Sequence, residues 1–399
     1  MNRLSSSAAL ACLLSASAFA AVVVLPAYNV SVSNVSVSGL SSGAYMAAQM
    51  HFAYSRTIKK GAGIVAGGPV YCSRGSVNIA AGPCMADTAS RDLPYLESVV
   101  NAWSNNGYID PTSNLAASRV YLFSGTLDST VRQPVMNDLN AMYGHYITPA
   151  SISYRNNIAA EHAMPTDFFG NSCATNASPY VDNCNLDTAG DILKWLYGPL
   201  NARNVGALGG AFVNFDQAPF WGNLNPNTHG MASSGYAYVP ANCGAGQACT
   251  LHVAFHGCQQ NVATVGVDFY ENAGYNRWAD TNNMIVLYPQ ATTTLANPDG
   301  CWDWWGYDDV NFPAKSGGQM VAIKTMIDRI VSGNATAPYT CGHWYASNYA
   351  HVSNGRAYVG RDGQAYATDS NQYLGFYSIF AYTDVRRTSA GYYAYGSCP

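Results

Sequence analysis

The sequence predicts an α/β fold with a mostly parallel sheet covered by helices on both faces, followed by a small all-β module. Short apolar stretches alternate with helix-like segments between residues 21 and 332. A stretch of small, polar and helix-breaking residues follows at 333–338 and is typical of a linker. Residues 339–399 hold 11 tyrosines and neither Lys nor Glu, arranged in short alternating runs between turn residues. We therefore expect a large domain at 21–332 and a Tyr-rich module at 339–399.

Within the large domain, each element is predicted from its apolar pattern and from the turn residues that flank it. Strands are expected at 35–38, 62–66, 119–123, 151–154, 235–239, 250–255 and 284–288. Helices are expected at 44–55, 93–103, 134–143, 189–197, around 272–279, and at 318–331. Regular alternation with short connections favours a parallel sheet buried on both faces.

The composition excludes several classes of partner. The 399 residues are 48% hydrophobic but only 11% charged, with a net charge of −4 and no basic run. Nucleic-acid binding requires clustered Lys and Arg, so it is not expected. The only uninterrupted apolar stretch lies at the N-terminus, so we expect no membrane partner for the rest of the chain. We expect a monomer that needs no cofactor.

Residues 1–20 are expected to be a secretory signal peptide. Arg3 supplies a positive charge, residues 8–14 are almost wholly apolar, and Ala18-Phe19-Ala20 forms a small-x-small cleavage site. A membrane anchor is the alternative, because residues 21–25 prolong the apolar run. Cys12 lies too early in the apolar segment to mark a lipoprotein. The sequence therefore favours secretion to the extracellular space.

The mature chain would keep ten of the eleven cysteines, an even number that in an exported protein favours disulfides. Pairing by proximity in the sequence is the simplest hypothesis. It gives Cys72/Cys84, Cys173/Cys184, Cys243/Cys249, Cys258/Cys301 and Cys341/Cys398, the last of which would bracket the Tyr-rich module. None of the cysteine spacings resembles a structural zinc site, so no metal is expected.

The strongest chemical motif is G-x-S-x-G at residues 39–43. Alone it is weak in a chain rich in Gly and Ser, but a β-like stretch enters it and a helix-forming run leaves it. A strand–turn–helix around such a serine is the nucleophile elbow of α/β-hydrolases, in which flanking glycines permit a strained turn. By position in the motif Ser41 is the expected nucleophile, and the N–H of the competing Ser42 is an expected oxyanion donor.

An α/β-hydrolase triad also needs an acid and then a histidine further along the chain. Asp128 follows the expected strand at 119–123, although a turn or capping role is its alternative. Asp138 lies inside the next helix and is a poorer candidate. His162 follows the expected strand at 151–154 and is the preferred base. Other histidines lie on helices or in the module: His51, His145, His343 and His351.

The second oxyanion donor is expected far downstream of the serine. Ser41 lies too close to the mature N-terminus for any upstream strand to supply it. The strand at 250–255 instead runs into His256-Gly257-Cys258, which has the usual form of an oxyanion loop. The front half of the sheet would then come last in the domain, as in a circular permutation, which adjacent termini make tolerable. His252 and His256 could form a metal pair, but no third ligand is evident.

The chain resembles secreted poly(3-hydroxybutyrate) depolymerases whose lipase box lies near the N-terminus of a circularly permuted α/β-hydrolase domain. The similarity covers about residues 25–332 and rests on five segments: VSVSGLSSG at 35–43, TLD at 126–128, HAMPTDF at 162–168, HGCQQ at 256–260 and GCWDW at 300–304. The resemblance implies the triad Ser41, Asp128 and His162. It also implies oxyanion donors at the N–H groups of Ser42 and Cys258, a Cys258–Cys301 bridge, and substrate contact by Trp304.

The remaining predictions concern the aromatic residues. Trp302, Trp304 and Trp305 could contact substrate, although core packing is expected for at least one of them. The tail resembles appended substrate-binding modules, and its tyrosines could either pack its core or adsorb to polymer. The expected function is hydrolysis of an insoluble polyester of short-chain hydroxyacids. The alternatives are a feruloyl or acetyl esterase of plant-wall polysaccharide and a non-catalytic polymer-binding protein.

Overall fold

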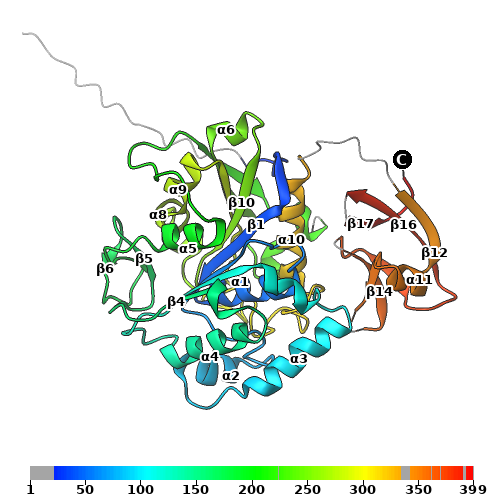
Figure 1. Ribbon diagram of the computed structural model, residues 1–399, viewed down its shortest axis with the longest axis horizontal. Helices are drawn as coiled ribbons and strands as arrows, with labels where there is room; N and C mark the ends of the chain where they lie inside the picture. Colours follow the sequence, from blue (N-terminus) through cyan, green and yellow to red (C-terminus); the bar gives the residue numbers. More distant parts are fainter. Residues whose placement is uncertain are drawn as a thin grey trace, which may run out of the picture.

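The computed structural model describes residues 22–222, 224–333, 342–360, 362–368, 370–389 and 392–398. An eight-stranded sheet crosses the large domain in the order β4-β3-β2-β1-β10-β11-β9-β8 (Figure 1). Its strands are β1 (Val30–Leu40), β2 (Gly61–Val65), β3 (Arg119–Phe123), β4 (Ile152–Arg155), β8 (Ala211–Asp216), β9 (Ser234–Val239), β10 (Cys249–Phe255) and β11 (Met284–Tyr288).

The sheet is mostly parallel, as predicted. Strands β4, β3, β2, β1, β10 and β11 run parallel to one another, whereas β9 and β8 are antiparallel to their neighbours. The antiparallel edge strand β8 is the one member of this sheet that the sequence analysis missed. The central strands β1 and β10 lie side by side in register, with Gly39 opposite Phe255.

Helices cover both faces of the sheet and bury one apolar cluster on each. One face carries α1 (Ser42–Ala53), α3 (Leu93–Asn105), α4 (Gln133–Gly144) and α10 (Gly318–Val331). The other carries α5 (Thr188–Tyr197), α8 (Asp268–Asn272) and α9 (Tyr275–Thr281). Because both faces are buried, the central strands are apolar along most of their length, which is the pattern that predicted them.

Shorter elements connect these layers. A small sheet of order β5-β7-β6 is formed by β5 (Met164–Thr166), β6 (Asn171–Ser172) and β7 (Val181–Asn183). The short helical segments are α2 (Val77–Ala81), α6 (Ala241–Gly244), α7 (Val262–Val265) and η1 (Gly82–Ala86), together with η2 (Thr112–Ala117), η3 (Pro149–Ser151), η4 (Ala218–Trp221) and η5 (Pro226–His229).

The C-terminal part forms two small antiparallel sheets. One has the order β12-β16-β17 and consists of β12 (Gly342–Ser347), β16 (Tyr382–Ser389) and β17 (Tyr392–Tyr395). The other has the order β13-β14-β15 and consists of β13 (Ala357–Val359), β14 (Gln364–Ala367) and β15 (Tyr373–Phe376). The prediction of an all-β module was wrong in one respect, because helix α11 (Asn348–Ser353) packs between the strands.

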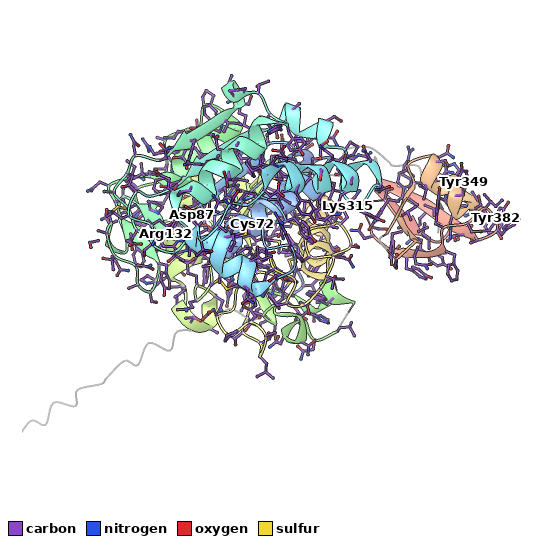
Figure 2. The ribbon with its side chains drawn as sticks, turned by 90° about the horizontal axis from the view of Figure 1, so that it is seen from below. Cys72, Asp87, Arg132, Lys315, Tyr349 and Tyr382 are labelled. Carbon is purple, nitrogen blue, oxygen red and sulfur yellow. A yellow bond between two sulfur atoms is a disulfide. The ribbon has the colours of Figure 1, made fainter. Side chains whose placement is uncertain are left out.

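This module contacts the large domain at the C-terminal end of α1. The amide of Asn371 donates to the Tyr54 hydroxyl at 3.2 Å, and the Lys315 ammonium lies 4.8 Å from the centre of the Tyr358 ring. In Figure 2, Lys315 lies where the two parts meet, whereas Tyr349 and Tyr382 lie at the far side of the module. Helix α1 thus carries Ser41 at its N-terminal end and the module contact at its other end.

Four of the cysteine pairings suggested by proximity are disulfides in the structure: Cys72–Cys84, Cys173–Cys184, Cys243–Cys249 and Cys258–Cys301. The spacings between these cysteines in the sequence were therefore a sufficient guide to their connectivity.

The fifth pairing, of Cys398 with Cys341, is not among these four bridges and stays a prediction. Cys398 is disulfide-bonded, but Cys341 lies outside the described residues, so the structure does not identify the partner of Cys398. The predicted signal peptide at residues 1–20 also lies outside the described residues. Within the described ranges, no helix is long and apolar enough to cross a bilayer.

A buried ion pair near the module contact gives a first prediction. Lys315 Nζ lies 3.0 Å from Asp110 Oδ1, with the two side chains 4% and 0% exposed. Asp110→Ala would leave the ammonium buried without its carboxylate, and we expect a loss of about 3–5 kcal/mol of unfolding free energy in urea titrations. The double variant Asp110→Leu/Lys315→Met should recover most of that loss. A loss below about 1 kcal/mol for the single variant, as for a surface pair, would contradict the prediction.

Candidate active site

Ser41 lies at a sharp turn between β1 and α1. Its backbone has φ 57° and ψ −122°, a conformation that non-glycine residues rarely adopt. Its N–H donates to Val65 O at 3.0 Å, which ties the turn to the neighbouring strand β2. A strained residue held by its surroundings is typical of a functional site. The predicted strand–turn–helix around Ser41 is confirmed as a local structure.

The two glycines of the motif are required by close backbone contacts. A Cβ atom on Gly39 would lie 2.2 Å from Gly43 O, and one on Gly43 would lie 2.3 Å from His256 O. Real side chains do not approach so closely. Only glycine at both positions lets the chain turn at Ser41 and lets α1 begin directly against the end of β10.

Asp128 and His162 are brought together by the loops that follow β3 and β4. His162 Nδ1 lies 2.9 Å from Asp128 Oδ2 and 3.1 Å from Oδ1. The N–H groups of Thr130 and Val131 also donate to Asp128 Oδ1, at 2.9 and 2.8 Å. An ionised carboxylate only accepts, so His162 carries a proton on Nδ1 and leaves Nε2 free to accept one. Both residues are buried, since Asp128 is 8% exposed and His162 is 6% exposed.

Glu161 joins the same two loops and was missed by the sequence analysis. Its Oε2 atom accepts from the N–H of His162 at 3.0 Å, and from Ser129 N and Oγ at 3.1 and 3.2 Å. One carboxylate therefore fixes the backbone beside both Asp128 and His162. The only sequence signal was a carboxylate directly before the candidate histidine, which by itself predicts no partner.

The loop after β10 lies beside Ser41. A Cβ atom on Gly257 would be 3.3 Å from Ser41 Cβ, so the peptides of this loop pass close to the candidate nucleophile. The N–H of Gly257 donates to Gln260 Oε1 at 2.7 Å. The Gln260 amide in turn donates to Pro179 O and Tyr180 O, at 2.9 and 2.8 Å. The candidate donor Cys258 follows directly and is bridged to Cys301.

The three candidate tryptophans occupy different environments. Trp302 is 0% exposed, and its indole N–H donates to His256 O at 3.0 Å. It is therefore a core residue, as was expected for at least one of the three, and the prediction that its side chain contacts substrate is corrected. Trp304 is 4% exposed and stacks on Tyr45 with ring centres 4.0 Å apart. Trp305 is partly exposed and packs edge-on against Trp304.

Asp303 shapes the loop that carries these tryptophans. Its carboxylate accepts from four successive backbone N–H groups, those of residues 306–309, at 2.7–3.3 Å. Burial raises the pKa of Asp303 to about 6, although these four donors act in the opposite direction. The buried carboxylate thus holds a tight loop behind Trp304 and Trp305.

The competing candidates have other partners. Asp138 pairs with the buried guanidinium of Arg91, and His145 lies 3.1 Å from Glu97. His343 pairs with Asp384 inside the module at 2.6 Å, and His351 bonds to Thr383 O at 2.9 Å. These contacts join all four residues to partners other than Ser41, Asp128 and His162.

His252 is buried between two serines of β1. Its Nδ1 and Nε2 atoms lie 2.7 Å from the hydroxyls of Ser36 and Ser38 respectively, and burial lowers its pKa to about 3. The side chain is therefore neutral and linked to β1. Among the residues that the structure describes, no group of three or more His, Cys, Asp or Glu side chains could hold a metal ion.

Comparison with known proteins decides the family. The chain is 40% identical to poly(3-hydroxybutyrate) depolymerase of Delftia acidovorans over 95% of both chains. It is 44% identical to polyhydroxybutyrate depolymerase of Talaromyces funiculosus over 78% of this chain and 94% of that protein. The chain belongs to the poly(3-hydroxybutyrate) (PHB) depolymerase family. No protein-family model matches it.

Solved structures agree with this family and its α/β-hydrolase-like fold. A serine-to-alanine variant of PHB depolymerase complexed with R3HB trimer superposes with a TM-score of 0.73 at 43% identity. PHB depolymerase from Penicillium funiculosum gives a TM-score of 0.72 at the same identity. Each covers 78% of this chain and 99% of its own. Neither alternative, the plant-wall esterase or the non-catalytic binding protein, has a counterpart among these relatives.

The Cys258–Cys301 bridge allows a test of the loop beside Ser41. It links residues 43 positions apart and so lowers the conformational entropy of the unfolded chain. For a loop of this length we expect Cys258→Ser/Cys301→Ser to lose about 4 kcal/mol of unfolding free energy. The peptide N–H of residue 258 remains in this variant, but its loop is less constrained. We therefore expect lower kcat on a soluble p-nitrophenyl ester at temperatures where the variant stays folded.

The Cys243–Cys249 bridge supplies the matched control. It closes a separation of 6 residues near the start of β10, so its double serine variant should lose about 2 kcal/mol. Its kcat should equal that of the parent, because the opposite end of β10 carries the loop beside Ser41. Equal kcat losses in the two double variants would contradict a specific role for Cys258–Cys301.

Proposed function

We propose that this chain is an extracellular serine esterase that hydrolyses the ester bonds of PHB or a related short-chain polyhydroxyalkanoate. The observation that carries the proposal is the buried Asp128–His162 pair, whose Nε2 atom can accept a proton, in a fold whose elbow presents Ser41 at the end of β1 in the same sheet. The names of the family members supply the substrate class. The enzyme releases soluble hydroxyacid monomers and oligomers and acts as a monomer.

The proposed mechanism follows from the proton positions. His162 Nε2 takes the Ser41 proton as Ser41 Oγ attacks the ester carbonyl, and Asp128 stabilises the resulting imidazolium. The backbone N–H groups of Ser42 and Cys258 donate to the oxyanion, a contribution of about 3 kcal/mol per donor. Collapse expels the alcohol end of the polymer with a proton from His162. Water, activated by the same histidine, then hydrolyses the acyl-enzyme.

Trp304 is the proposed substrate contact beside this site. Its stacking on Tyr45 and the edge contact with Trp305 make a rigid apolar wall. An uncharged polyester chain offers methyl groups and ester carbonyls but no charge, so apolar walls with backbone donors match its chemistry.

Circular permutation is proposed for the order of the strands. Strands β1–β4 form one half of the sheet, and β8–β11, which follow in the chain, form the other. The C-terminus of α10 lies against the segment that leads into β1: Tyr28 N–H donates to Ile330 O at 2.8 Å, and the Arg329 side chain donates to Leu25 O at 2.8 Å. Because the two ends of the large domain lie side by side, a permutation can join them and create new chain termini at another loop without changing the fold.

Secretion with removal of residues 1–20 is likewise proposed. Four disulfides within the described residues fit an oxidising compartment. A signal peptide in the first 20 residues would supply the route, and sequencing the N-terminus of the exported protein would locate its cleavage.

The module is proposed to adsorb to the polymer surface. One buried apolar cluster of the module consists of the aliphatic residues Ala357, Ala365, Ala367, Leu374 and Val385, and the ring of Tyr358 is buried as well. Many of its large rings lie outside this cluster: Phe380 is 85% exposed, Phe376 69% and Tyr345 68%. Tyr345 packs against Tyr382 with ring centres 5.6 Å apart, so these exposed rings support one another. Exposed aromatic rings suit a flat, uncharged solid.

Replacement of the nucleophile tests the chemical step. Ser41→Ala removes the attacking oxygen, so we expect kcat on a soluble p-nitrophenyl ester to fall by about 10⁴-fold or more. Clearing of a PHB suspension should stop, while the melting temperature and adsorption to granules stay close to those of the parent. Retained clearing by the purified variant would refute the assignment of Ser41.

Replacement of exposed module rings tests adsorption separately. Phe380→Ala/Tyr382→Ala removes two large side chains, and we expect at least about tenfold weaker adsorption to PHB granules. Hydrolysis of a soluble ester should not change, because these rings belong to the module and the candidate catalytic residues belong to the large domain. The control is Tyr95→Ala, which removes a ring of similar class, 41% exposed on α3. Unchanged adsorption of the double variant would argue against binding through this face.

A further inference from the structure

His256 lies at the end of β10 and is a fully buried histidine whose hydrogen bonds define its proton position. Its Nε2 atom is 3.0 Å from Ala291 N, and its Nδ1 atom is 2.7 Å from Gly257 O. A backbone N–H can only donate, so Nε2 is the unprotonated acceptor. A carbonyl can only accept, so Nδ1 carries the proton and donates it to Gly257 O. The two contacts leave a single tautomer.

This hydrogen bond fixes the orientation of the peptide between Gly257 and Cys258. In a trans peptide the C=O and N–H bonds lie in one plane and point in opposite directions. With Gly257 O directed to the imidazole, the Cys258 N–H must point to the opposite side of the loop. No hydrogen bond from Cys258 N is found among the residues that the structure describes, so this N–H is available to a ligand.

The residues on either side are held by the Gly257 N–H bond to Gln260 and by the Cys258–Cys301 bridge, whereas the His256 contact acts on the carbonyl of this peptide itself. Residues 256–260 lie beyond the last paired residue of β10, and Gly257 has no side chain to restrict rotation. A rotation of this peptide would turn a carbonyl oxygen toward the developing oxyanion and replace attraction by repulsion. The ring that prevents this is itself held by Trp302 and Phe269, at centre distances of 5.3 and 6.2 Å.

We propose that His256 is a positioning residue that aims the Cys258 N–H at the oxyanion by holding the carbonyl of the same peptide. The inference rests on the proposed function, because it presupposes that ester carbonyls are attacked by Ser41. It differs from a structural role in that the donor geometry, and not the stability alone, depends on the protonated Nδ1. Burial lowers the pKa of His256 to about 4, so the ring keeps this neutral tautomer at neutral pH.

Two substitutions separate the two hydrogen bonds of the ring. In His256→Asn the amide nitrogen occupies about the place of Nδ1 and can still donate to Gly257 O. In His256→Gln the longer side chain places its terminal oxygen near the Nε2 position, where it accepts from Ala291 N–H but leaves Gly257 O without its donor. Both variants lose one buried hydrogen bond, so their stabilities should be similar.

The expected kinetics differ between the two variants. On a soluble p-nitrophenyl ester, His256→Gln should lower kcat by about 10²–10³-fold with little change in KM, as for removal of one oxyanion donor. His256→Asn should retain most of the parent's kcat. The Ki of an alkylboronic acid, which mimics the tetrahedral intermediate, should rise for His256→Gln by the factor by which kcat/KM falls.

The matched control is His51, another fully buried histidine, which bonds to Tyr143 and Ser118 away from the site. His51→Gln should lose stability without a comparable change in kcat. Equal kcat for His256→Asn and His256→Gln, or a kcat loss in His51→Gln as large as in His256→Gln, would overturn the proposal. Ester hydrolysis that survives in Ser41→Ala would instead overturn the proposed function, so the two failures are distinguishable.

Discussion

The close approach of α1 to the end of β10 is the constraint on which the rest of the site depends. The two central strands run parallel and in register up to Gly39 and Phe255, so the turn after β1 and the loop after β10 emerge side by side. Three glycines make this possible. Gly39 lets the turn close on itself, Gly43 lets α1 begin against His256 O, and Gly257 lets the loop pass within contact of Ser41. Side chains at these positions would separate the candidate nucleophile from the candidate oxyanion donor.

Polar side chains, both buried and half-buried, then stabilise this arrangement from several directions. On one face of β1, Ser36 and Ser38 bracket His252, and each serine also contacts a tyrosine hydroxyl at 2.7 Å. Beyond the ends of the strands, Glu161 ties the two loops that carry Asp128 and His162. A buried polar group stabilises a unique structure only when its partners are present, so removal of one member from the Ser36–His252–Ser38 contacts costs stability. The site is thus supported by one set of hydrogen bonds along β1 and another between the loops that carry Asp128 and His162.

The sequence predicted those parts of the fold whose signal is local. The sequence predicted the exact bounds of β3, β11 and α10, at 119–123, 284–288 and 318–331. The two strands are buried on both faces and are therefore apolar along most of their length, and the apolar residues of α10 recur with the period of a helix. Strand β8 was missed because most of its residues are half-exposed at the sheet edge. The strands of the small sheet are two or three residues long and have no period to detect.

The site residues also divide into those with a local sequence signal and those without one. Ser41 could be predicted from five consecutive residues, and Asp128 and His162 from their places after strands. Glu161 and His256 each contact the next residue in the chain, but their second partners, Ser129 and Ala291, are 32 and 35 residues away, and nothing in the local sequence encodes those contacts. The tryptophans show the limit most clearly, because Trp302 and Trp304 are two residues apart and similar in type. The fold buries Trp302 against His256 and places Trp304 on Tyr45 of α1.

Since α1 also contacts the module at Tyr54, this one helix connects the candidate site, its aromatic wall and the module whose exposed rings we propose adsorb to polymer.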